Sequence, residues 1–591
     1  MASRWPCKSA SRSVSTCTEF GASIGDGLLL LFSPLLETLL PHSGLLSRSD
    51  AIYFVPQNYE MTQQNLTKFA RLCGCAFLAM CVACGGGPPS DSTGGGGGST
   101  GGDTTAPAYF GMQQSHIVGC DSTQPYPIFD GPVGSYRAFG GSCAAFWVGM
   151  DNGPSASPQY DFSGIDTLLS TLRSRGIDEV LITLGRTPNY ISSNPTDLEC
   201  DGSDTGSAGQ CDPPSDVDAI RGSGLGDGSD ASWRNYVTAL LQHVTASGYA
   251  SSHAHIAFYE IWNEFHRSDT LSQGAVTCAV PPNGIACSYR GTFAQMLRMT
   301  QDLRCIVEGN ASDPITALGT TCGSGGFTAT GLDTTATVAE GNAGGSAFDA
   351  GNSVMANYLS YANGAGAAAT DFIDGHSYFS NGAEPEGLMQ YVAAEEQLAP
   401  SKPYYVSEGS WGKNDTQPDP SLQAAYLPRW YLMLDILNVQ RAYWFAWDEA
   451  VSAGNGSLWS ASALTAPPLQ CQTADNGGDL CTGGVAYDQS VGWLSGATLG
   501  AVTCPRRCTN PSSGVFVVNL TRSGGYEAQI LWDSTPVSGC SNPQCGSTPI
   551  GAGPSFTVLQ WRDVTGTTHS GAPTTVGASP IILENMAPPS S

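Results

Sequence analysis

Two glutamates stand where buried strands are expected to end. The run IAFYEIWNE (256–264) is apolar and aromatic until Asn263-Glu264, and PYYVSEGSWG (403–412) carries Glu408 in the same way. Such runs predict buried strands. In a parallel barrel, side chains at the carboxyl ends of the strands meet at one face. Two carboxylates that meet can cleave an acetal, because one protonates the leaving oxygen while the other attacks the carbon or directs water.

Two other interpretations bear on this pair. A glutamate after a strand can form a surface ion pair, but the buried run before Asn263 argues against this for Glu264. Glu260 is a rival carboxylate on the same strand; it lies deeper and is interpreted as structural. The sequence has no HExxH and no GxxxxGK[ST] pattern, so we expect no metal and no cofactor.

Strand-like and helix-like segments alternate from residue 108 to about residue 500. This alternation predicts a parallel sheet, and eight strands predict a (β/α)8 TIM barrel in which Glu264 ends strand four and Glu408 strand seven. The expected strands are 109–117, 134–140, 179–185, 255–264, 314–321, 371–379, 403–409 and 440–448. The expected helices, from apolar residues at helical spacing, are 162–176, 231–244, 420–438 and 485–497, and no helix is evident between the first two strands.

Residues 503–587 differ from the rest, because strand-like runs alternate there with Gly, Pro and Ser turns. They predict a small C-terminal antiparallel β-sandwich, an accessory domain beside the catalytic domain of residues 108–500. Its Trp532 and Trp561 could stack on sugar or fill a core, and a core position is the commoner one.

The first 107 residues are expected to lie outside the fold. Residues 1–60 are interpreted as an upstream extension that does not belong to the protein, with translation starting at Met61. Residues 61–83 have the basic, apolar and small-residue order of a signal peptide. Cys84 follows Val82-Ala83 as in a lipoprotein, so we expect lipidation there. Residues 84–107 are a Gly-, Ser- and Pro-rich linker; a plain secreted linker remains the alternative.

The cysteines indicate an oxidising compartment. Fourteen of the 20 lie from Cys120 to Cys545, and read in order they form close neighbours. Sequential pairing is the simplest connectivity, and metal binding is disfavoured because no histidine lies at ligand spacing. The pairs are Cys120/Cys143, Cys200/Cys211, Cys278/Cys287, Cys305/Cys322, Cys471/Cys481, Cys504/Cys508 and Cys540/Cys545.

The net charge of −27 disfavours nucleic acid as a partner, because phosphates would be repelled. It suits a soluble protein that acts on a neutral polymer. We expect a carbohydrate partner, contact with a membrane only through an N-terminal lipid anchor, and a monomer.

The order and spacing of these motifs resemble clan A of the glycoside hydrolases, which are retaining enzymes on (β/α)8 barrels. Within the clan, the layout is similar to glycoside hydrolase family 39 and its bacterial relatives. The resemblance covers about residues 108–585, and Phe265 departs from it where clan members often have proline. The matching segments are QYDFSGIDTLLSTLRSRG with LITLGRTPNY, SWRNYVTALLQHV with YEIWNE, DGHSYF, PYYVSEGSWG and the terminal PIILEN.

The resemblance implies a role for each matching residue. Glu264 would be the general acid/base and Glu408 the nucleophile. Asn263 would bind the sugar 2-hydroxyl, while His376 and Tyr378 would orient the sugar and Glu408. Trp447 would form the floor under the sugar, with Trp444 as its rival, and Arg137 would support Glu408 electrostatically.

The sequence thus predicts a secreted or lipid-anchored retaining glycosidase that cleaves a β-linked oligo- or polysaccharide. Two alternatives stay open, which are a carbohydrate-binding lipoprotein without activity and a transglycosylase on the same scaffold.

Overall fold

A computed structural model describes most of the chain after residue 103. The upstream extension, the signal peptide, Cys84 and the linker up to residue 103 lie outside the described residues. The described ranges are 104–113, 133–140, 145–200, 208–272, 277–278, 287–309, 314–315, 320–321, 332–333, 337–343, 349–380, 384–413, 420–447, 462–464, 481–509, 512–536 and 545–589.

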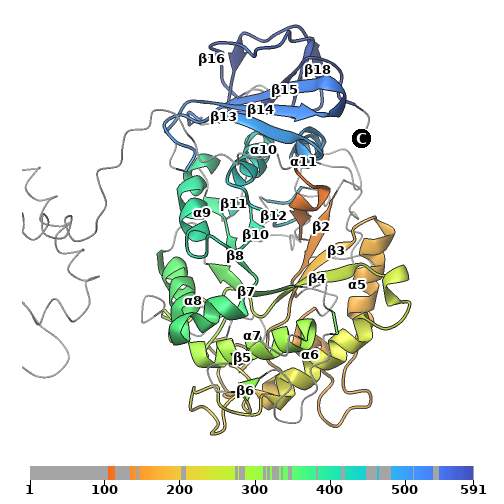
Figure 1. The fold of residues 1–591 in the computed structure, drawn as a ribbon, viewed down its shortest axis with the longest axis vertical. Coiled ribbons are helices and arrows are strands. Elements are labelled where there is room, and N and C mark those ends of the chain that lie inside the picture. Colours follow the sequence, from red (N-terminus) through yellow and green to blue (C-terminus); the bar gives the residue numbers. More distant parts are fainter. Residues whose placement is uncertain are drawn as a thin grey trace, which may run out of the picture. The chain divides into compact units, whose positions relative to one another are not determined.

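Parallel strands form a closed barrel in the order β1-β12-β10-β8-β7-β4-β3-β2 (Figure 1). The sheet closes because β1 pairs with both β12 and β2. The arrangement is a TIM-barrel-like α/β fold, which confirms the predicted fold class. The strands are β1 (Phe110–Met112), β2 (Ser135–Ala138), β3 (Glu179–Thr183), β4 (His255–Glu260), β7 (Thr337–Ala343), β8 (Phe372–His376), β10 (Tyr404–Gly409) and β12 (Arg441–Trp444).

The predicted fifth strand, 314–321, is wrong. Among the described residues, Pro314–Ile315 (β5) and Thr320–Thr321 (β6) pair with each other and with no barrel strand, and β7 occupies the barrel position between β4 and β8. The sequence of β7, TVAEGNA, has one β-branched aliphatic residue and little strand propensity. Its place depends on hydrogen bonds to strands on both sides, which override local propensity.

The barrel interior is layered, because alternate residues of each strand point inward. One buried layer consists of Leu181, Phe258, Phe372, Tyr405 and Tyr443. The Phe372 and Tyr405 rings stack with centroids 4.4 Å apart, and Phe258 meets both edge-on. Two residues further along, four of the five strands have a polar residue, namely Thr183, Glu260, Asp374 and Ser407. This apolar layer therefore supports a polar layer at the carboxyl ends of the strands.

Helices follow the strands and form the outer layer of the barrel (Figure 1). Between β1 and β2, no helix occurs in the part of the chain that the structure describes. The predicted helices are present within three residues at each end. The helices are α4 (Trp147–Met150), α5 (Ser163–Ser174), α6 (Ala231–Val244), α7 (Phe293–Glu308), α8 (Asp349–Ala369), α9 (Met389–Glu396), α10 (Pro420–Ile436) and α11 (Thr482–Leu494).

An antiparallel sheet in the order β13-β14-β15-β20-β17-β18 follows the barrel. One face, with Phe516 and Trp532, joins the main hydrophobic core, and the other, with Trp561, forms a small core of its own. Both tryptophans are buried, so neither offers an exposed ring to sugar. The strands are β13 (Thr498–Thr503), β14 (Val515–Arg522), β15 (Tyr526–Asp533), β17 (Gln560–Asp563), β18 (Thr568–Ser570) and β20 (Ile581–Glu584), and a ribbon of β16 (Thr548–Pro549) and β19 (Thr575–Val576) lies beside them.

A buried polar cluster links the sheet to the barrel. Arg429 of α10 donates to Glu386, which follows β8 in the short helix η4 (Pro385–Leu388), with an Nε–Oε1 distance of 2.8 Å. Trp532 of β15 donates its indole N–H to the same oxygen at 2.6 Å. Arg429 also binds Glu384. These charged groups are buried, so separating the sheet from the segment after β8 would leave them unpaired. The cluster therefore fixes the sheet against that segment.

Three predicted disulfides are present, namely Cys200–Cys211, Cys278–Cys287 and Cys504–Cys508. Cys305, Cys481 and Cys545 are also disulfide-bonded, while their predicted partners and the Cys120/Cys143 pair lie outside the described residues. Of the described helices, none combines the length and apolar character needed to span a membrane.

The aromatic layer makes a stability prediction. We expect Phe372→Ala to lower the free energy of unfolding by about 3–5 kcal/mol, because it leaves a cavity against Phe258 and Tyr405. Leu559→Ala is the control; Leu559 is 58% exposed, and we expect a change within about 0.5 kcal/mol. Urea denaturation measures both. Equal effects of the two substitutions would contradict a packed barrel interior.

Candidate active site

Glu264 lies in a tight turn directly after β4. Its backbone φ of +46° is in the left-handed region, which is costly for a residue with a side chain. The Arg267 N–H donates to the Glu264 carbonyl at 2.8 Å and closes the turn. Phe265, where the resembling family often has proline, is buried and packs edge-on against Tyr358 of α8. The turn thus anchors Phe265 in the core and presents Glu264 at the mouth of the barrel.

Glu264, His376 and Glu408 converge at the carboxyl ends of β4, β8 and β10. Each offers one ligand atom, and the three atoms lie within 4.8 Å of one another. His376 lies between the two carboxylates, with Nδ1 3.0 Å from Glu264 Oε1 and Nε2 3.6 Å from Glu408 Oε2. The predicted pair is therefore brought together although 144 residues separate it in the sequence.

Both oxygens of Glu408 receive hydrogen bonds from buried donors. Arg137 Nη1 lies 2.8 Å from Oε2, and the Tyr378 hydroxyl donates to Oε1. Burial and the nearby Glu408 charge raise the pKa of Tyr378 well above its usual value, so the phenol keeps its proton and remains a donor. The next residue must be glycine, because a Cβ at Gly409 would lie 2.5 Å from the Ser377 carbonyl oxygen.

Arg137 is the centre of the polar layer. Besides Glu408, it binds Glu260 Oε2 through Nε at 3.0 Å and Nη2 at 2.7 Å, and it donates to Asn263 Oδ1 at 2.8 Å. Thr183 also donates to Glu260. Burial lowers the pKa of Arg137, but the charges of Glu260 and Glu408 raise it more, so the guanidinium stays protonated. These bonds place Glu260 beside Arg137, and its interpretation as a structural residue stays a prediction.

Glu264 has a different electrostatic environment from Glu408. Arg267 Nη1 lies 3.0 Å from its Oε2, and the side chain of Glu264 is 15% exposed. Burial raises the pKa of Glu264, but the His376 hydrogen bond and the charges of His376 and Arg267 lower it more. The pKa therefore falls well below its usual range, and the free protein holds Glu264 ionised at neutral pH.

Trp447 does not lie where the resemblance implied. It is fully buried, and its ring packs edge-on against Tyr487 of α11, so it has no exposed face for a sugar. Trp444 is also buried, against Trp430 of α10. The aromatic side chain that is partly exposed at the end of β12 is Phe445, whose N–H donates to the Gly409 carbonyl at 2.9 Å. The predicted strand, 440–448, ended four residues beyond Trp444, where β12 ends.

Several further residues of the site were not singled out from the sequence. Gln113 directly follows β1 and lies 3.5 Å from Arg137, so the strand-end argument that found Glu264 also applies to it. Thr183 ends β3 in the same way. Arg267 had no comparable signal, because it lies in a loop and reaches Glu264 only through the turn at φ +46°.

The triad of Glu264, His376 and Glu408 also has the donor set of a metal site. Arg137 already binds Glu408 at 2.8 Å, and its charge opposes a cation there. We derive no metal chemistry from this geometry, and the expectation of no metal stays a prediction.

No protein-family model matches the chain, and no curated protein matches it. The solved structures similar to it include glycoside hydrolases. A glucosidase from Croceicoccus marinus is 12% identical, with a TM-score of 0.46 over 82% of this chain and 97% of that one. The catalytic domain of GH30 xylanase C from Talaromyces cellulolyticus is 14% identical (TM-score 0.44, 83% and 98%). The GH51 arabinofuranosidase from Xanthomonas axonopodis pv. citri is 10% identical (TM-score 0.43, 82% and 97%). These values assign no family, and the resemblance to family 39 stays a prediction.

The charge balance around Arg137 makes a second prediction. Arg137→Met leaves Glu260 and Glu408 buried without their cation, so we expect the free energy of unfolding to fall by about 3–5 kcal/mol. Adding Glu260→Met should recover part of this loss, because one unpaired charge is removed.

Arg267→Met is the matched control, because that side chain is 29% exposed; we expect a change of about 1 kcal/mol or less. Chemical denaturation at neutral pH measures all four proteins. An Arg137→Met variant as stable as the control would show that the guanidinium does not hold this layer together.

Proposed function

We propose that the chain is a retaining glycoside hydrolase that cleaves a β-linked oligo- or polysaccharide with Glu264 and Glu408. The observation that carries the proposal is the pair of carboxylates, of which one oxygen each lies within 4.8 Å of the other. Retaining enzymes hold their two carboxyl groups about 5–5.5 Å apart, whereas inverting enzymes leave about 6.5–9.5 Å for a water. The spacing therefore favours direct attack by one carboxylate.

Glu408 is the proposed nucleophile. Hydrogen bonds from Arg137 and Tyr378 fix the direction of its oxygens. Attack on the anomeric carbon forms a glycosyl ester and breaks the bond to the leaving oxygen. The negative charge of Glu408 is consumed in this step, but the second oxygen of the ester can still accept a hydrogen bond. Arg137 remains balanced by the charge of Glu260.

Glu264 is the proposed acid/base. It protonates the leaving oxygen first and later takes a proton from the water that cleaves the ester. Its low pKa in the free protein means that substrate binding must restore the proton. The simplest route is displacement of Arg267 from Glu264 Oε2 by the leaving-group sugar, because losing a cation raises the pKa of a carboxyl group.

Asn263 is proposed to bind the sugar 2-hydroxyl. Arg137 fixes its Oδ1, which leaves the amide N–H group to donate. His376 orients both carboxylates, and Phe445 replaces Trp447 as the proposed aromatic contact under the sugar.

The remaining sequence-based expectations belong to the same proposal. They are the (β/α)8 catalytic domain at 108–500, the accessory sandwich at 503–587, a monomer, and export with lipidation at Cys84. The disulfides of the described residues support export, because such bonds persist in oxidising compartments.

A panel of aryl β-glycosides and polysaccharides tests the proposed function. We expect the protein to hydrolyse at least one member of the panel. NMR of the products should show that the anomeric configuration is retained. Glu408→Gln and Glu264→Gln should each lower kcat by about 10³-fold or more on a substrate with a poor leaving group. Glu527→Gln, an exposed position on β15, is the control and should leave kcat unchanged.

Inversion would exclude the double displacement. Retained activity in both glutamine variants would place catalysis elsewhere, and binding without turnover would favour the carbohydrate-binding alternative. Product analysis with an added sugar acceptor distinguishes hydrolysis from transglycosylation.

The pKa of Glu264 gives a pH prediction. The alkaline limb of kcat/KM reports the acid of the free enzyme, so we expect kcat/KM to fall already as pH rises through the acidic range. Arg267→Met removes a charge that lowers this pKa, and the limb should move up by roughly one pH unit. A limb that stays in place or moves to lower pH would contradict the assignment of Glu264 as the acid.

A further inference from the structure

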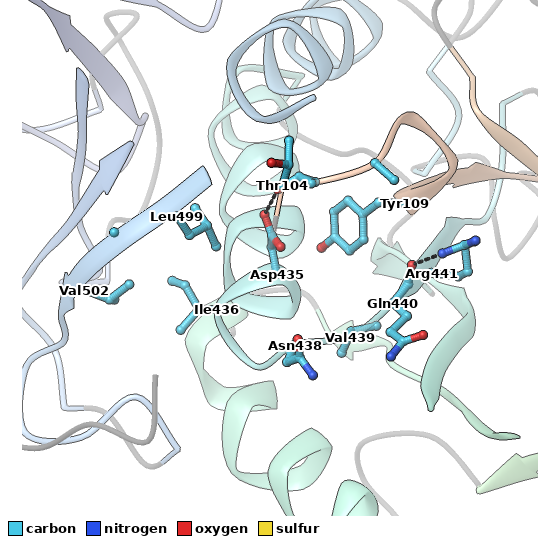
Figure 2. A pocket seen from close by; sticks show the side chains of 13 residues that line it. Thr104, Tyr109, Asp435, Ile436, Asn438, Val439, Gln440, Arg441, Leu499 and Val502 are labelled. Carbon is cyan, nitrogen blue, oxygen red and sulfur yellow. Dashed lines mark hydrogen bonds between the residues drawn. The ribbon is translucent and has the colours of Figure 1, made fainter. Parts of the chain in front are cut away.

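A cavity lies at the opposite end of the barrel strands from the candidate active site. It has a volume of about 330 Å³ and lies where β12 begins and α10 ends (Figure 2). Glu264 and Glu408 lie instead at the carboxyl ends of the strands. This volume falls within the range of about 300–1,000 Å³ that is usual for small-molecule sites. Its lining residues are Thr104, Thr105, Ala106, Tyr109, Asp435, Ile436, Asn438, Val439, Gln440, Arg441, Leu499, Gly500 and Val502.

Asp435 is the one carboxylate among these lining residues. Thr105 donates to its Oδ2 at 3.0 Å, and no basic side chain of the described residues forms an ion pair with it. Arg441 lines the same cavity, but its guanidinium is bound to Glu179, with Nη2 3.1 Å from Oε2. The negative charge of Asp435 is thus left without a matching cation in this part of the structure.

The end of α10 adds to this negative character. Asp435 lies in the last turn of the helix, which contains no basic residue. The carboxyl end of a helix carries a partial negative charge, so a carboxylate there is unfavourable and a cation is favourable. Burial raises the pKa of Asp435 to about 7 although the Thr105 hydrogen bond lowers it. The helix end and the carboxylate therefore both attract a positive charge into the cavity.

The rest of the wall is mixed, with polar side chains at Thr104, Thr105, Asn438 and Gln440 beside four aliphatic ones. Ile436, Val439, Leu499 and Val502 line the cavity, and Figure 2 shows Leu499 and Val502 on one side of Asp435 with Tyr109 on the other. A metal ion such as Ca²⁺ is usually held by several carboxylates among six or more oxygen ligands, and this cavity has one carboxylate. An ammonium group needs only a few acceptors, and an attached alkyl chain gains from contact with the aliphatic side chains.

We propose that this cavity binds a small organic ammonium compound, with its charged group on Asp435 and its hydrocarbon part against Leu499, Val502, Ile436 and Val439. The site does not depend on the proposed glycosidase activity, because none of its lining residues belongs to the candidate active site.

Calorimetric titration of the full chain with n-butylammonium chloride tests this proposal, with 1-butanol as the uncharged control of equal shape. We expect n-butylammonium to bind at about pH 8.5, and to bind roughly 30-fold more weakly at about pH 5.5, where most of Asp435 is protonated. The other titratable groups facing Asp435 are Tyr109 of η1 (Pro107–Tyr109) and Arg441 of β12 with its partner Glu179; Tyr109 and Arg441 keep their protons over this range. The cavity residues of β13 do not titrate.

Asp435→Asn is the matched variant. It keeps an acceptor for Thr105 and removes the charge, so we expect it to lose n-butylammonium binding, while Leu499→Gln should weaken n-butylammonium more than methylammonium. Equal binding to the wild type and Asp435→Asn, or no heat of binding to the wild type up to about 50 mM at pH 8.5, would overturn the proposal. Equal affinity for n-butylammonium and 1-butanol would do the same, and this comparison needs no variant.

Discussion

The arrangement of the candidate site depends on one buried guanidinium. Arg137 stands in the interior of the barrel, and its donors hold Glu260, Glu408 and Asn263 at distances of 2.7–3.0 Å. A buried cation is tolerated only when carboxylates surround it, and buried carboxylates in turn need the cation. Because these residues come from β2, β4 and β10 or the turns that follow, strands distant in the sequence must keep one register at their carboxyl ends. The buried apolar layer of Leu181, Phe258, Phe372, Tyr405 and Tyr443 covers the guanidinium on the side toward the amino ends of the strands.

The same charges give the two glutamates different environments. Glu408 is bound by donors that Glu260 helps to keep in place, whereas Glu264 is bound by Arg267 at the partly exposed edge of the site. A nucleophile has to remain ionised, while an acid has to gain a proton when the substrate arrives. When the substrate binds, Glu264 can lose its contact with Arg267, because Arg267 is partly exposed. Glu408 is held from inside the barrel and keeps its donors. This difference is the physical basis for the roles proposed for Glu264 and Glu408.

Strand ends could be predicted where the sequence contains a long apolar run with an abrupt polar end. IAFYEIWNE and PYYVSEG met this condition, and the structure brings Glu264, Glu408, Asn263, His376, Tyr378 and Arg137 together. The prediction of the fifth strand was wrong, because TVAEGNA has no such run and depends on its neighbours for its conformation. Trp447 failed because β12 ends at Trp444, so that the partly exposed ring belongs to Phe445. Arg267 could not be predicted, since a left-handed turn at Glu264 is not visible in the sequence.

The central claim is that Glu408 attacks the sugar directly. The measurement that tests it most directly uses a 2-deoxy-2-fluoro glycoside with a good leaving group, chosen from the sugar that the protein hydrolyses. The fluorine slows breakdown of a glycosyl ester, so the ester accumulates, and mass spectrometry of the digested protein locates it. The account predicts one added sugar on the peptide that contains Glu408, and none on that peptide in Glu408→Gln. A sugar attached to Glu264 or to any other residue, or rapid turnover of the probe with inversion and no attached sugar, would contradict it.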